Sequence, residues 1–206
     1  MTYLFTHPDV VGLRLAQHLE IVTIALAIAF ALALPLGALA AHDARLRGPL
    51  LAVLGVAYTL PSLAVFALLI PVFGLGLVTT EIALVAYAQM ILVRNIVAGL
   101  QSVPSAMTDA ARGLGMTPAQ IFWRVEFPQA LPVIVGGLRL AAVATISIAT
   151  LAGKIDAGGL GALLFAGLDN DDSGRIVAGS IAAAGLAIGI DALLRRLERV
   201  ALDRAR

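Results

Sequence analysis

Long apolar stretches alternate with short polar segments along this chain. Five apolar stretches stand out, at residues 21–41, 50–73, 82–103, 131–153 and 176–194. Each is long enough to cross a hydrocarbon core of about 30 Å as a helix that rises roughly 1.5 Å per residue. None alternates with the period of two that a membrane barrel strand requires. Because a helix satisfies its own backbone amides in lipid, the pattern predicts an all-α integral membrane protein with five transmembrane helices.

Three prolines lie well inside these stretches, away from their first residues. Pro35 is in the first stretch, and Pro61 and Pro71 are in the second. Proline lacks the backbone N–H group that a helix interior uses. We therefore expect local kinks at these positions within continuous spans.

The first stretch has some features of a cleaved signal peptide, because Ala38-Leu39-Ala40 resembles a cleavage site. The run is longer than the apolar region of a signal peptide. It also follows the acidic residues Asp9 and Glu20 rather than a basic segment. We therefore expect the first span to be retained.

The composition indicates one membrane-embedded domain over residues 1–206. Hydrophobic residues make up 60% of the chain and charged residues 13%, and the mean hydropathy is +0.97, as in integral membrane proteins. The 14 basic and 13 acidic residues nearly balance and are scattered, so nucleic acid is not an expected partner. The chain has no cysteine, and its three histidines are isolated. We therefore expect no metal site and no redox chemistry.

The basic residues fall unevenly between the polar segments. If the N-terminus lies outside, the outer segments hold only Arg14, Lys154 and Arg175. The inner side then holds Arg45, Arg47, Arg94, Arg112, Arg124, Arg139, Arg195, Arg196, Arg199, Arg204 and Arg206. Cytoplasmic loops of membrane proteins carry the excess of lysine and arginine. We therefore predict an outer N-terminus and a cytoplasmic C-terminus, with membrane lipid around the spans.

One polar segment, between the third and fourth spans, has the features of folded structure. Pro104 and Ser105 begin a short helix that we predict over residues 105–113. Gly113 and Gly115 should end it, since glycine adopts the backbone conformation that a helix stop requires. The orientation predicted above places this segment in the cytoplasm.

A second short helix is predicted to follow. Thr117-Pro118-Ala119-Gln120 has the residues of a capping box, so this helix should run to Phe127 and stop at Pro128. Trp123, Arg124 and Glu126 should form its polar or interfacial side. Helices this short are marginal in water and need a partner or a membrane surface. An amphipathic loop that lies on the membrane is the alternative.

The spacing in this segment resembles a known motif. Asp109-Ala110-Ala111 is followed after three residues by Gly115, after nine more by Val125, and then by Phe127-Pro128. This resembles the Glu-Ala-Ala loop of bacterial ABC importer permeases, which reads Glu-Ala-Ala, three residues, Gly, nine residues, Ile, one residue, Leu-Pro. All the spacings match, and the chain has Asp for Glu, Val for Ile and Phe for Leu.

The resemblance extends over about residues 18–190, to the permeases for glycine betaine, choline and related osmoprotectants. The matching runs are Leu60-Pro61-Ser62-Leu63-Ala64, residues 69–76, Arg94-Asn95, residues 110–116, residues 131–134 and Ala157-Gly158-Gly159-Leu160-Gly161. One departure is Lys154-Ile155-Asp156, where the family has a neutral Ile-Gly before the glycine-rich run.

The resemblance implies a type I ABC importer permease in the bacterial cytoplasmic membrane. It implies a cytoplasmic coupling loop over residues 104–130 that contacts an ATPase. The residues implied in coupling are Asp109, Ala110, Ala111, Arg112, Gly113, Gly115, Val125, Phe127 and Pro128. The implied partners are ABC ATPase subunits, a second permease subunit, identical or paralogous, and an extracytoplasmic substrate-binding protein. The implied cargo is an osmoprotectant such as glycine betaine, choline or carnitine.

The chain itself has no residues for ATP hydrolysis. Its only lysine, Lys154, lies in Gly-Lys-Ile, and no Gly-x-x-x-x-Gly-Lys-Ser/Thr loop is present to bind phosphates. We therefore expect a transport subunit rather than an enzyme, without a cofactor of its own. The resemblance implies that the partner ATPase uses ATP and Mg²⁺.

Residues for the solute path are harder to identify from the sequence. Quaternary ammonium groups bind aromatic faces. The candidate residues for the solute path are Tyr58, Pro61, Ser62, Tyr87 and Asp156. Packing in the core or against lipid is the alternative role of the aromatic side chains. An ABC permease for another amino acid such as methionine also fits the loop and the spans, and a channel or scaffold subunit is a further alternative.

Overall fold

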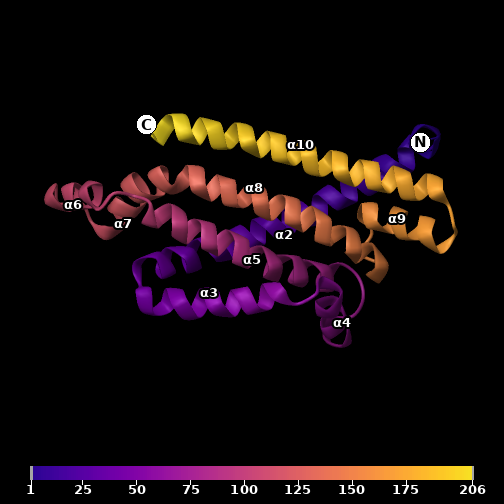
Figure 1. The fold of residues 1–206 in the computed structure, drawn as a ribbon, viewed down its shortest axis with the longest axis horizontal. Coiled ribbons are helices and arrows are strands. Elements are labelled where there is room, and N and C mark those ends of the chain that lie inside the picture. Colours follow the sequence, from indigo (N-terminus) through magenta and orange to yellow (C-terminus); the bar gives the residue numbers. More distant parts are fainter. Residues whose placement is uncertain (1, 206) are drawn as a thin grey trace.

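The structure is a computed structural model that describes residues 2–205, and these residues form an elongated bundle of helices (Figure 1). The α-helices are α1 (Thr2–Thr6), α2 (Pro8–His42), α3 (Ala44–Thr59), α4 (Ser62–Phe73), α5 (Leu77–Gln101), α6 (Ser105–Gly113), α7 (Pro118–Ile121), α8 (Phe127–Leu151), α9 (Gly159–Asp169) and α10 (Ser173–Ala205). A π-helical turn, η1 (Phe122–Glu126), joins α7 to α8, and a 3₁₀ turn, η2 (Ala152–Ile155), follows α8. The all-α fold class is confirmed.

Among the described residues, four helical segments are long and apolar enough to cross a membrane. They are Pro8–His42, Leu77–Gln101, Pro118–Ile155 and Ser173–Asp203. The first segment begins well before residue 21, because its polar N-terminal turns also pack into the protein: His18 is fully buried there and contacts the Ile146 carbonyl oxygen through Nε2 at 3.2 Å.

The second predicted span, residues 50–73, is not one kinked helix. It consists of α3 and α4, whose axes differ in direction by 94°. Leu60 and Pro61 between them are extended, with ψ of 136° and 131°. A residue before proline is driven away from the helical conformation, so Pro61 breaks the helix that we expected it only to bend. Counted as one broken span, the pair brings the crossings from four to the predicted five.

The centre of the bundle is made by α2, α5 and α8, with α10 along α8 and α3 along α5 (Figure 1). Small residues at every fourth position of α2 form a fully buried stripe of Ala25, Ala29 and Ala33, which Gly37 continues. A Cβ atom at Gly37 would lie 2.6 Å from the side chain of Ile96 on α5. Alanine and glycine therefore form the packing surface between α2 and α5, as is common where helices meet in membranes.

The glycine-rich run at residues 157–161 forms the turn after η2 and the first residues of α9. Gly158 and Gly159 have φ angles of +82° and +67°, which suit glycine. A Cβ atom at Gly161 would overlap the carbonyl group of Thr150 in α8. The run therefore lets α9 pack directly against the end of α8.

Replacing Gly161 with alanine tests this close approach. Alanine favours helices over glycine, yet the added methyl group must displace the α8 backbone, and such overpacking costs about 1–3 kcal/mol. We expect a lower melting temperature of the detergent-solubilised protein. Gly185→Ala in α10 is the matched control, because a Cβ atom there has no neighbour within 4 Å. Equal melting temperatures for the two variants would contradict the packing described here.

Candidate functional site

The 105–128 segment lies at one end of the bundle, the left end in Figure 1, together with the C-terminal end of α10. Its first part is α6, which has the bounds predicted from the sequence. Gly115 has a φ of +77°. Its N–H group donates to the Arg112 carbonyl at 2.9 Å, and that of Met116 donates to the Ala111 carbonyl at 3.2 Å. These two bonds form a Schellman motif, so the helix stop predicted at Gly113 and Gly115 is present. We call this turn the elbow, and Gly115 is the residue whose backbone requires glycine.

The capping box after the elbow is also present. The Gln120 N–H group donates to Thr117 Oγ1 at 3.3 Å, and the Thr117 N–H group donates to Gln120 Oε1 at 2.8 Å. The two bonds satisfy backbone groups that the start of a helix leaves unpaired. The turn from α6 into α7 is therefore fixed by local hydrogen bonds.

The predicted stop at Pro128 is wrong. Helical structure continues from Pro118 to Ile155, and the Phe127 N–H group bonds to the Phe122 carbonyl five residues earlier. This π-helical turn places Pro128 in the first turn of α8, where a proline is tolerated. Val125, Phe127 and Pro128 therefore lie at the junction between the 105–128 segment and a spanning helix.

The surface of α6 and the elbow is open. Asp109 and Arg112 form an ion pair at 2.6 Å, and both side chains are more than 60% exposed, so the pair contributes little to stability. Leu114 is 83% exposed and Trp123 is 56% exposed. Apolar side chains on an otherwise polar projection are typical of a surface that a partner covers. Of the alanines in the motif, Ala110 is exposed and Ala111 is buried.

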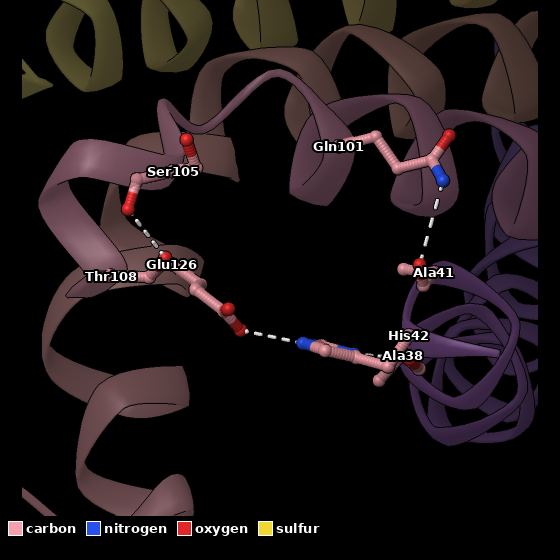
Figure 2. Close-up of polar contacts among 7 residues, drawn as sticks. All are labelled: Ala38, Ala41, His42, Gln101, Ser105, Thr108 and Glu126. Carbon is pink, nitrogen blue, oxygen red and sulfur yellow. Dashed lines mark hydrogen bonds and ion pairs between the residues drawn. The ribbon is translucent and has the colours of Figure 1, made fainter. Parts of the chain in front are cut away.

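The sequence led us to expect Glu126 on a polar or interfacial side of the second short helix. The structure places it elsewhere. Its side chain is only 11% exposed, and its Oε2 atom lies 3.0 Å from Nε2 of His42 at the end of α2. Figure 2 shows the two side chains pointing toward each other from different parts of the bundle. Gln101 at the end of α5 donates to the Ala41 carbonyl at 3.4 Å beside them. The sequence shows no sign of this contact, because the two residues are 84 positions apart.

Four of the five proposed path residues come together at the break between α3 and α4. The Tyr58 and Tyr87 rings meet edge to face with centroids 6.0 Å apart. The Tyr87 O–H group donates to the Leu60 carbonyl at 2.5 Å. Pro61 and Ser62 form the break and the first residue of α4. Tyr87 is buried and thus has a packing role in addition to any other.

Asp156 belongs to a different element. It is the exposed residue that ends η2, with a left-handed φ of +61°. The neighbouring Lys154 pairs with Asp169 of α9 at 3.1 Å and lies 5.5 Å from the centroid of the Phe165 ring. The positive charge that departs from the family pattern is therefore balanced within the chain.

A cavity of about 320 Å³ lies between the first half of α2 and the start of α5. The carboxylates of Glu20 and Glu81 line it, with Gln17 and apolar side chains. One Gln17 contact, from the Gly159 N–H group to Oε1 at 3.3 Å, ties this part of α2 to the glycine-rich turn.

Replacing Tyr87 with phenylalanine tests the hydrogen bond at the helix break. The variant loses the donor to the Leu60 carbonyl, and hydrogen bonds between helices in membranes contribute about 0.6 kcal/mol on average and roughly 1.7 kcal/mol at most. We expect a lower melting temperature for the purified protein. Tyr58→Phe removes a hydroxyl group from the neighbouring, more exposed ring, so a loss as large in this control would argue against the assigned bond.

The sequence profile of one family, described as binding-protein-dependent transport system inner membrane component, matches residues 33–202. The osmoprotectant import permease protein OsmW of Salmonella typhimurium is 40% identical over 189 residues, which cover 89% of this chain and 88% of the relative. The glycine betaine/carnitine/choline transport system permease protein OpuCB of Bacillus subtilis is 34% identical over 97% of this chain and 92% of the relative.

Among solved structures, a chain of the methionine ABC transporter MetNI in an inward-facing conformation matches with a TM-score of 0.82. The identity is 22%, and the match covers 90% of this chain and 93% of that chain, so it bears on the fold. The predicted type I importer fold is confirmed by this likeness. The chain belongs to the binding-protein-dependent transport system inner membrane components, and it is a multi-pass permease of an ABC transport system rather than its ATPase.

Proposed function

We propose that this chain is the permease subunit of an ABC importer for an osmoprotectant such as glycine betaine, choline or carnitine. The observation that carries the proposal is the similarity, over nearly the whole chain, to permeases whose names state these cargoes. The likeness to the methionine transporter concerns the fold alone, at 22% identity. An osmoprotectant is therefore favoured over methionine as the cargo.

The 105–128 segment is the part that contacts the ATPase. It projects from the bundle, carries the exposed apolar side chains of Leu114 and Trp123, and continues directly into α8. Closure of the ATPase on ATP and Mg²⁺ pushes the segment, and the helix that follows carries the movement into the bundle. The residues of the Glu-Ala-Ala-like motif, from Asp109 to Pro128, form or shape this surface.

The 105–128 segment faces the cytoplasm. Arg45 and Arg47 follow α2 directly at the end of the bundle where His42 meets Glu126. The arginines at 195, 196 and 199 lie in the last turns of α10, and Arg206 lies outside the described residues. A basic bias of this kind marks the cytoplasmic side, so α2 starts at the outer face and α10 ends at the inner one.

A second permease subunit, identical or paralogous, completes the solute path. Helix α3 has no buried residue, and a chain of five crossings is too small to enclose a path alone. The break between α3 and α4, with Tyr58, Pro61, Ser62 and Tyr87, lies beside this open face and contributes to the path. Asp156 contributes at the outer mouth, where an extracytoplasmic binding protein delivers the solute.

Uptake by the reconstituted complex tests the cargo. The chain is purified with its ATPase and binding protein, incorporated into liposomes that contain ATP, and offered radiolabelled glycine betaine, choline, carnitine, proline and methionine in turn. We expect ATP-dependent uptake of at least one of the first three compounds. Uptake of methionine alone would overturn the assignment, and uptake without an ATPase would indicate a channel.

Replacing Gly115 with leucine tests the role of the elbow. Leucine is strained at a φ of +77°, and positive φ costs a non-glycine residue roughly 1–2 kcal/mol. We expect ATP hydrolysis stimulated by the loaded binding protein to fall at least about tenfold. A tenfold fall corresponds to a loss of roughly 1.4 kcal/mol of coupling free energy. Membrane insertion should remain. Gly48→Ala in α3 is the control, because a Cβ atom there has open space; unchanged coupled hydrolysis in Gly115→Leu would refute the role.

A further inference from the structure

One ion pair joins the end of the first long helix to the π-helical turn of the 105–128 segment. His42 is the last residue of α2 and Glu126 is the last residue of η1. Nε2 of His42 lies 3.0 Å from Oε2 of Glu126 (Figure 2). The glutamate side chain is 11% exposed, whereas the histidine is 54% exposed, so the carboxylate is largely enclosed by the protein and the imidazole ring lies partly at the surface.

The surroundings of the imidazole ring define the chemistry of the contact. Nδ1 of His42 lies 2.8 Å from the Ala38 carbonyl oxygen, so each ring nitrogen faces an oxygen atom. A carbonyl oxygen and a carboxylate oxygen both accept hydrogen bonds, so the ring is held between two acceptors. One of these acceptors belongs to α2 itself and the other to η1, so the ring bridges the two elements.

The position of Glu126 in a π-helical turn gives the contact its significance. Such turns insert one extra residue into an α-helix and occur frequently at functional sites. Here the turn stands between α7 and α8, at the point where the 105–128 segment becomes a spanning helix. The segment therefore joins the bundle at two points, through residues 102–104 to α5 and through η1 to α8.

The space around the pair allows movement. A cavity of about 420 Å³ separates the end of α2 from the elbow, and both His42 and Glu126 line it, together with Arg112 and Met116. The Arg112 side chain donates a hydrogen bond to Asp109. Asp43 beside the pair caps α3 by accepting from the Arg45 N–H group at 2.8 Å. Glu126 is thus the carboxylate that the structure pairs with His42.

We propose that the His42–Glu126 ion pair transmits the displacement of the 105–128 segment to α2. The two residues are positioning residues, because they act through the helices that they join. The inference rests on the proposed coupling function of the segment. When the segment moves, the pair makes α2 move with η1 and α8 rather than leaving α2 behind across the cavity. Since α2 packs along α5 through its alanine stripe, the displacement reaches the centre of the bundle.

Single substitutions in the reconstituted complex test this link. We expect Glu126→Gln and His42→Ala each to lower uptake, and the ATP hydrolysis stimulated by the loaded binding protein, by about five- to tenfold, which is at the low end of typical coupling between sites. Assembly of the complex should be unchanged. Asp203→Asn, which neutralises an exposed carboxylate in α10, is the matched control. Coupled hydrolysis at the unmodified level in both single variants would overturn the proposal.

Two rescue experiments separate a link from a merely structural role. His42→Lys keeps a cation at the helix end and should recover most of the coupling that His42→Ala loses, although it lacks the ring. Because the chain has no cysteine of its own, the pair His42→Cys and Glu126→Cys can be joined by a short bismaleimide. The tether should restore coupled hydrolysis, and a tethered protein as impaired as the untethered one would contradict the proposal.

Measuring Gly115→Leu in the same preparations separates the coupling role of the 105–128 segment from the role of the His42–Glu126 pair. If that variant retains coupled hydrolysis, the segment does not couple the ATPase, and the proposed function fails together with the inference. If Gly115→Leu is impaired while Glu126→Gln and His42→Ala are not, the coupling function stands and only the ion-pair link is refuted.

Discussion

The close approach of helix backbones is the constraint on which this bundle depends. In lipid there is no hydrophobic drive to bring helices together, so contact area has to come from packing. The stripe of Ala25, Ala29 and Ala33 on α2 gives α5 a flat surface with no exposed atoms, and Gly161 lets α9 rest on the α8 backbone. Many large apolar side chains, such as Leu68, Val72 and Ile188, are exposed on the outside of the bundle, as expected where lipid rather than water surrounds the helices.

Where the helices break, side chains replace the missing backbone bonds. Tyr87 donates to the Leu60 carbonyl at the turn from α3 to α4. In the next turn, the Thr79 hydroxyl group donates to the Gly74 carbonyl at 2.5 Å, and the Thr80 hydroxyl group donates at 3.0 Å to the Gly76 carbonyl, which also accepts the Thr80 N–H group. Exposed carbonyl groups are costly at membrane depth. At these two breaks, hydroxyl groups of α5 therefore pair with the irregular backbone.

Features determined by neighbouring residues could be predicted from the sequence. Helix α6, the Thr117–Gln120 capping box and the glycine elbow depend on local hydrogen bonds, and they have the predicted form. The family and the fold also follow from motifs with fixed spacing. The arrangement of Tyr58 and Tyr87 around Pro61 was predicted only as a set of candidates, and no sequence pattern stated that their rings touch.

Two kinds of feature could not be predicted from the sequence: those in which local preferences compete with packing, and contacts between residues that are far apart in the chain. The effect of a proline depends on its surroundings: Pro35 lies inside α2, Pro61 separates two helices, and Pro128 lies in the first turn of α8 after a π-helical turn. The choice reflects packing that local rules do not contain. The contact between His42 and Glu126 joins segments 84 residues apart and depends on the whole bundle.

The length of α2 has a further consequence. Its 35 residues extend about 52 Å, well beyond a hydrocarbon core of about 30 Å. Near one end, Gln17 accepts from Gly159 and His18 lies against the same glycine; at the other, His42 meets the π-helical turn. One continuous helix thus touches the irregular backbone at both ends of the bundle. If α2 tilts about its packed middle, its two ends move in opposite directions, so a single helix can open one mouth of the permease while it narrows the other.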